Sequence, residues 1–251
     1  MLKIVGVAMA GLLMVAQPTS AQPKWAQGQT YSGNIDIGGV QVPLLSGDWI
    51  VTGVEQIVLN NAGSGGQTNV ALAQLSDGKL RAYMMLSYNQ QALSRGWNVT
   101  DSKNCLRNEI HYAVVISDMQ LAKSCSYVNH AVFTIAANSA KWWKDTVDYA
   151  KRHNIAVPLT AILSGTVVSD RANFVSVAYY FNPEAKGFPG PINTAWQTSD
   201  WSALNVASNE QKKSYIQSII EWTNSTRSVV EAGLAGKLKK GESLDWPTAM
   251  Q

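Results

Sequence analysis

Alternating apolar and polar positions in the middle of the chain predict β-strands. The clearest pair covers residues 69–75 and 80–88, with Asp77–Gly78 between them, and predicts a tight β-hairpin. The apolar side chains of the second strand share one face: Leu80, Ala82, Met84 and Leu86. The other face is mixed, which is typical of an antiparallel sheet that is covered on one side.

Further strands are expected on both sides of this hairpin. They cover residues 34–45, 49–59, 110–116, 158–168 and 174–181. Gly38–Gly39 predicts a turn or bulge in the first of them, and Gly53 predicts a kink in the second. Residues 158–168 and 174–181 form a second predicted hairpin.

Two segments, about 138–153 and 208–236, change to the helical period. The apolar stripe of the first includes Trp143, Val147 and Ala150. The stripe of the second includes Ile216, Ile219 and Ile220. Asn138 or Ser139 can cap the first helix, and Ser208 followed by Gln211 predicts a capping box for the second.

These elements predict an α+β fold, a mostly antiparallel β-sheet with both amphipathic helices packed on one face. No repeat or linker suggests a boundary, so residues 22–251 are expected to form a single domain. Its two ends, residues 22–33 and 242–251, are where loose packing is expected.

The first 21 residues resemble a secretory signal peptide. They contain Lys3, an apolar run from Ile4 to Ala16, and small residues that end at Ala21. An uncleaved membrane anchor is the alternative, but the run is shorter than the roughly 20 apolar residues of a membrane-spanning helix. No later segment is long and apolar enough to span a membrane. We therefore expect a periplasmic or secreted protein.

Composition narrows the functional classes. Hydrophobic residues make up 46% of the chain and charged residues 15%, which suits a well-packed core rather than disorder. A formal net charge of +3 is too small to indicate nucleic-acid binding. The chain has no HExxH, CxxC, GxSxG or phosphate-loop motif, so no cofactor, metal or ordinary α/β-hydrolase is expected.

Cys105 and Cys125 are the two cysteines of the chain. In an exported protein such a pair predicts a disulfide, which stabilises by about 3 kcal/mol for a loop of roughly 20 residues. Cys125 also lies five residues before His130, so a thiol enzyme with His130 as its base is a weaker alternative.

Glu109 and His111 lie two residues apart on a predicted strand, where both can face the same side. With His130 they could form an acid–base cluster. A solvent-facing polar pair is the simpler interpretation.

The loop at residues 182–201 carries the most unusual pattern, several large rings beside proline and glycine. Exposed rings can bind sugars, peptides or a protein partner. The candidate binding residues are Phe188, Trp196, Asp200 and Trp201, with Glu184 as a further acceptor. Alternatively, the rings fold back to cover the edge of the sheet.

The sequence therefore favours an exported, non-catalytic protein that binds a protein partner or small ligand through residues 182–201. The second hypothesis is a periplasmic hydrolase or transferase that uses Glu109, His111 and His130. The sequence does not identify the ligand.

Overall fold

The computed structural model describes residues 25–37, 39–58, 66–76, 78–89, 105, 107–119, 122–134, 136, 139–169, 174–239 and 241–251. The predicted signal peptide at residues 1–21 and the predicted helix cap Asn138 lie outside the described residues.

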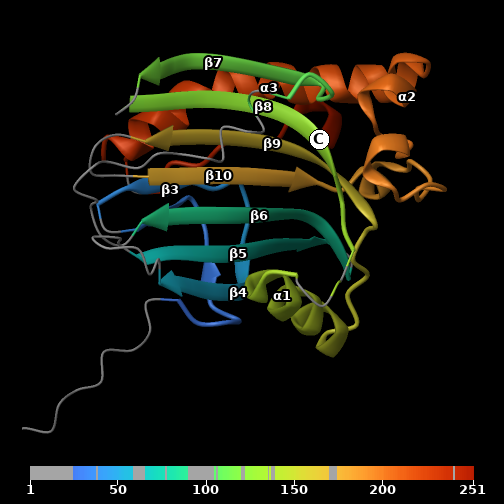
Figure 1. Cartoon of the computed structure of the whole chain (residues 1–251). Helices are drawn as coiled ribbons and strands as arrows, with labels where there is room; N and C mark the ends of the chain where they lie inside the picture. The colour runs from blue at the N-terminus through green and yellow to red at the C-terminus, as the bar shows by residue number, and fades with distance from the viewer. Residues whose placement is uncertain are drawn as a thin grey trace, which may run out of the picture.

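Eight of the described strands form one antiparallel sheet in the order β1-β4-β5-β6-β10-β9-β8-β7 (Figure 1). Their bounds are β1 Thr30–Tyr31, β4 Trp49–Val58, β5 Gly66–Ser76, β6 Lys79–Asn89, β7 Tyr112–Met119, β8 Ala122–Val132, β9 Thr160–Ser169 and β10 Phe174–Phe181. A second, small sheet pairs β2 (Asn34–Asp36) with β3 (Gln41–Pro43). The predicted class, α+β with mostly antiparallel sheet, is confirmed.

Two meanders make up the large sheet. Strands β4, β5 and β6 follow one another in the first, and β7 to β10 in the second. The pairing of β6 with β10, from Ala82 opposite Phe181 to Tyr88 opposite Val175, joins the two meanders. Both predicted hairpins are present, as β5–β6 and β9–β10. The kink expected at Gly53 is a register shift between Val51 and Gly53.

The helices of the described chain are α1 (Lys141–Arg152), α2 (Ala203–Ala207) and α3 (Glu210–Leu234). Short 3₁₀ turns are η2 (Pro183–Lys186), η3 (Trp196–Thr198) and η4 (Thr248–Met250). Asn209, rather than the predicted Ser208, caps α3, because its side chain accepts a hydrogen bond from the backbone N–H of Lys212 at 3.1 Å.

Helices α1 and α3 cover opposite faces of the sheet, which corrects the prediction that both lie on one face (Figure 1). Consecutive strand residues point to opposite faces. Accordingly, Tyr179 contacts Trp222 of α3 with ring centroids 5.3 Å apart, while Tyr180 contacts Tyr83 at 4.8 Å. Tyr83 in turn contacts Trp143 of α1 at 5.7 Å. The mixed face of β6 was therefore a second buried face.

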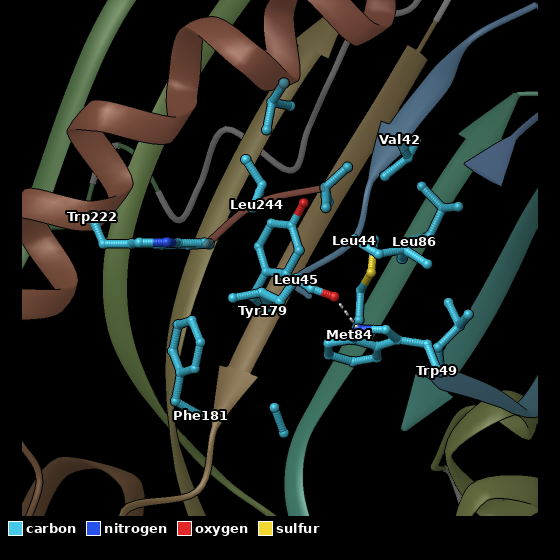
Figure 2. Close-up of a cluster of buried hydrophobic side chains, with 14 of the residues drawn as sticks. Val42, Leu44, Leu45, Trp49, Met84, Leu86, Tyr179, Phe181, Trp222 and Leu244 are labelled. Atoms are coloured by element: carbon cyan, nitrogen blue, oxygen red, sulfur yellow. Dashed lines mark hydrogen bonds between the residues drawn. The ribbon is translucent and has the colours of Figure 1, made fainter. Parts of the chain in front are cut away.

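The largest core lies between the sheet and α3 (Figure 2). Strands β6 and β10 contribute Met84, Leu86, Tyr179 and Phe181, all nearly inaccessible to solvent. Two polar atoms in this core are satisfied by backbone carbonyl groups. Trp49 Nε1 donates to Leu45 O at 2.8 Å, and Tyr179 Oη donates to Pro43 O at 2.8 Å. The core therefore holds the N-terminal strands β2 and β3 and the loop after them against α3.

Within the described residues, both ends of the domain place large side chains in the core. Trp25, Trp246 and Met250 are buried and belong to the main core. Burial of such large side chains offsets the entropy lost when a terminal segment becomes ordered. Among the helices of the described residues, none has the length and apolar character needed to cross a bilayer.

Candidate functional site

Residues 182–207, which we call the cap segment, follow β10 and include the loop singled out from the sequence. The side chain of Asn182 fixes its start, donating to Leu80 O at 2.7 Å and accepting from Glu184 N at 3.0 Å. Gly187 ends η2 with a φ of 83°, a conformation that strains residues with a side chain. The segment continues through η3 and α2 to the start of α3, at the right-hand end of the sheet in Figure 1.

The cap segment lies directly on the two histidines that the sequence proposed as catalytic. His130, in β8, stacks on Trp196 with ring centroids 4.9 Å apart. Its Nε2 lies 2.7 Å from Trp196 O, and Trp196 Nε1 donates back to His130 O at 3.3 Å. His111, just before β7, has its Nε2 2.9 Å from Trp201 O. The structure thus brings the two separate sets of candidate residues together.

These contacts determine the protonation of both histidines. A backbone carbonyl can only accept a hydrogen bond, so Nε2 carries the proton in each ring. Burial lowers the pKa of His111 to about 4, against the opposing effect of its bond to Trp201 O, and the nearby His130 lowers it further. Burial also lowers the pKa of His130, again opposed by the carbonyl of Trp196. Both imidazoles are therefore neutral at pH 7.

The proposed acid–base cluster is only partly assembled. The rings of His111 and His130 lie 6.0 Å apart, whereas Glu109 is exposed. His130 Nδ1 is buried and has no hydrogen-bond partner among the described residues. Within the same part of the chain, no group of three or more His, Cys, Asp or Glu side chains could hold a metal ion.

The candidate binding residues differ in their exposure. Trp201 is 1% exposed and packs against Phe188 and Tyr215, with ring centroids 5.1 and 5.5 Å away. Trp196 and Phe188 are half-buried. Asp200 accepts a hydrogen bond from the backbone N–H of Ile192 at 2.7 Å, so its carboxylate stabilises the cap segment itself.

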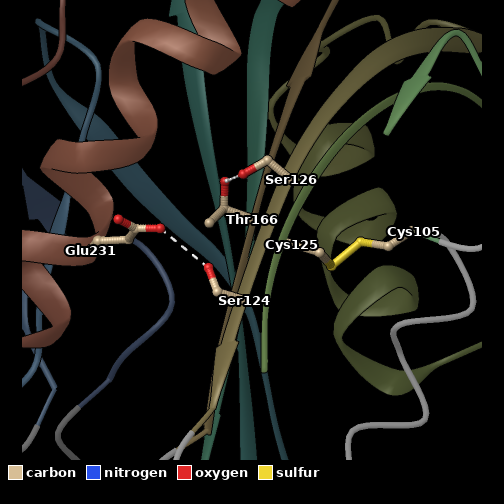
Figure 3. The surroundings of a disulfide bond; sticks show 6 residues. All are labelled: Cys105, Ser124, Cys125, Ser126, Thr166 and Glu231. Atoms are coloured by element: carbon tan, nitrogen blue, oxygen red, sulfur yellow. Dashed lines mark hydrogen bonds between the residues drawn. A yellow bond between two sulfur atoms is a disulfide. The ribbon is translucent and has the colours of Figure 1, made fainter. Parts of the chain in front are cut away.

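The cysteines form the predicted disulfide, which pins residue 105 against β8 (Figure 3). Cys125 packs with Tyr127 and Val167 on the face opposite α3. His130 is five residues further along the same strand, and an odd spacing places it on the other face. The disulfide and the opposite orientation of the two side chains exclude the Cys125–His130 thiol enzyme.

An open groove lies beside Phe188, between the cap segment and α3. It consists of two hollows of about 560 and 480 Å³ that share Phe188, Gln211 and Ser214. We call it the α3 groove. Its remaining lining residues are Lys186, Gly187, Pro189, Glu210, Tyr215, Gln217, Ser218, Glu221, Thr248 and Ala249.

Most of the α3 groove was not found from the sequence. Phe188 was a candidate binding residue, but Gln211 was assigned only to a helix cap. The sequence feature that could have indicated the groove is the run of polar residues on the exposed side of α3. No protein-family model matches this chain, and neither a curated protein nor a solved structure matches it.

Proposed function

We propose that this chain is an exported, non-catalytic binding protein that takes an elongated, uncharged and hydroxyl-rich ligand, an oligosaccharide, in the α3 groove. One observation carries the proposal, namely two adjoining hollows that share Phe188, Gln211 and Ser214. Each hollow is within the size range of about 300–1,000 Å³ that is usual for ligand pockets. Because they adjoin at these three residues, they suit a chain of linked units.

The groove lining supports the choice of ligand. Gln211 and Ser214 are exposed and form no side-chain hydrogen bond within the described part of the chain, so their donors and acceptors are available. Thr248 adds a hydroxyl group, and the half-buried ring of Phe188 adds an apolar surface. Amide and hydroxyl groups around an aromatic ring match the alternating polar and apolar surfaces of a sugar.

Two further features support the rest of the proposal. The Cys105–Cys125 disulfide is typical of proteins that leave the reducing cytoplasm, which supports export. Both histidines donate hydrogen bonds to the cap segment, which supports a structural role for them.

Ser214→Trp tests the groove, because Ser214 lines both hollows and a large side chain at this exposed helical position would obstruct them. Ser228→Trp is the matched control, since it makes the same change at another exposed position of α3 about 20 Å away along the helix axis. The full chain and both variants are applied to an array of immobilised oligosaccharides. We expect wild type and Ser228→Trp to bind equally and Ser214→Trp to lose binding.

Equal binding by Ser214→Trp and wild type would contradict the groove. If none of the oligosaccharides binds while an array of extended peptides does, the assignment of the ligand to the sugars is wrong.

A hydrolase or transferase is the second candidate, and His130 favours it. Its unprotonated Nδ1 has no partner among the described residues and could act as a base if the cap segment moved. Hydrolysis of a generic ester by wild type, but not by His130→Gln, would favour this function. Gln retains a donor for Trp196 O but has no basic nitrogen.

A further inference from the structure

A smaller hollow of about 240 Å³ lies on the other side of η2 from the α3 groove. We call it the basic pocket. Its lining residues are Ser76, Lys79, Arg81, Glu184, Ala185, Lys186, Met250 and Gln251. Three of these side chains are positively charged and one is negatively charged, so the pocket favours an anion.

Arg81 is held in place by the fold. The pairing of β5 with β6 shifts register so that Leu75 faces Leu80 and Gln74 faces Ala82, which leaves Arg81 as the extra residue of a bulge. Bulges redirect a side chain out of its regular orientation. The guanidinium lies 3.8 Å from the ring centroid of Trp246, and Nη2 donates to Met250 O at 3.0 Å. These contacts use only one of its five N–H groups for a hydrogen bond.

The two lysines complete the positive charge. Lys79 precedes Arg81 on β6, and Lys186 comes from η2; both are exposed. Neither lysine nor Arg81 forms an ion pair within the described residues, although Glu184 lines the same pocket. Three unpaired cations around one small hollow repel one another, and a bound anion would relieve this repulsion.

We propose that the basic pocket binds the oxyanion of a small molecule, either a carboxylate or a phosphoryl group. The planar fork of an arginine matches both groups with two parallel hydrogen bonds, and lysines add charge from the sides. Lys186 also lines the α3 groove, so the two sites adjoin. The basic pocket does not depend on the groove, because a free anion can be tested alone.

The experiment is an NMR titration of the full chain with inorganic phosphate and, separately, with succinate, at constant ionic strength. The probes are the backbone amide signals of residues 79–81 and 184–186. The test variant is Lys79→Gln/Lys186→Gln, and the control Lys151→Gln/Lys237→Gln removes the same charge at exposed sites elsewhere. We expect saturable shifts in wild type and control and roughly tenfold weaker affinity in the test variant.

The stronger of the two probes identifies the preferred group, and saturation by either one supports the proposal. Absence of saturation with both probes would overturn it. An equal loss of affinity in the test and control variants would also overturn it, because that result would show a general effect of net charge.

Discussion

The cap segment contains two contrasting regions, one closed over buried side chains and one open to solvent. At residues 196–201 it closes over His111 and His130, and its backbone carbonyls accept both Nε2 protons. At residues 184–189 Phe188 contacts Tyr215 of α3, with ring centroids 5.2 Å apart, and open hollows lie on both sides of η2. The first region contains histidines, which often act as catalytic acids or bases, whereas the hollows of the second are lined by lysine, glutamine and serine residues.

The comparison indicates that a candidate binding residue is better recognised by its unused hydrogen-bonding groups than by its residue type. His130 and Trp201 are buried and His111 is half-buried, and Nε2 of each of these histidines is hydrogen-bonded to a backbone carbonyl of the cap segment. Lys79, Lys186 and Gln211 are exposed and have no side-chain partner within the described residues. Free groups next to a hollow can bind a ligand, whereas satisfied groups stabilise the fold.

Trp201→Ala should have the largest effect on the closed region. Removing this ring from the contact with Phe188 and Tyr215 should lower the free energy of unfolding by about 3–5 kcal/mol, as for other buried aromatic residues. Urea unfolding followed by circular dichroism measures the change.

Leu204→Ala is the control, because Leu204 is 81% exposed and belongs to the same cap segment. Its substitution should change the free energy of unfolding by less than about 0.5 kcal/mol. Similar losses for both variants would contradict the division into a closed and an open region.

Lowering the pH should have the next largest effect on the stability of the closed region. Well above pH 6.5 both histidines are neutral in the folded and unfolded chain, so their contribution to stability is complete. Below pH 6.5 His111 becomes protonated in the unfolded chain, whereas in the folded protein it stays neutral until the pH approaches its lowered pKa of about 4. In this window each pH unit lowers the free energy of unfolding by at most about 1.4 kcal/mol for one histidine, and partial solvent exposure makes the loss smaller.

His111→Gln isolates this contribution from that of the carboxylates. Glutamine can still donate to Trp201 O but does not titrate. We expect the free energy of unfolding of the variant to fall less steeply than that of wild type between pH 6.5 and 4, as measured by urea unfolding at several pH values. Parallel curves would show that His111 does not titrate as the buried contact requires.

Local patterns predicted the parts of the fold that depend on neighbouring residues. The β5–β6 and β9–β10 hairpins, both long helices and the disulfide follow from alternation, period, turn residues and the cysteine count. Strand β8 was missed as a continuous strand, because Ser126 and His130 are polar yet buried. They bond to Thr166 and Trp196, which are distant in sequence.

The candidate sites depend even more on distant contacts. The α3 groove joins Phe188 to residues 211–221 and 248–249, so no local pattern marks it. In the basic pocket, the bulge that redirects Arg81 breaks the regular alternation on which the strand prediction relied. The sequence pointed to the cap segment, but its folding decided which residues remained open.

Ile192→Ser should have the smallest effect. Ile192 is 96% exposed, and its backbone N–H, rather than its side chain, binds Asp200. Because the substitution removes no packing, the free energy of unfolding should change by less than about 0.5 kcal/mol, as measured by urea unfolding of the full chain. Oligosaccharide binding should also be unchanged, since Ile192 does not line the α3 groove. A loss of binding at unchanged stability would instead place the contact surface on the loop at residues 182–201 outside the α3 groove, and the sequence alone predicted binding through this loop.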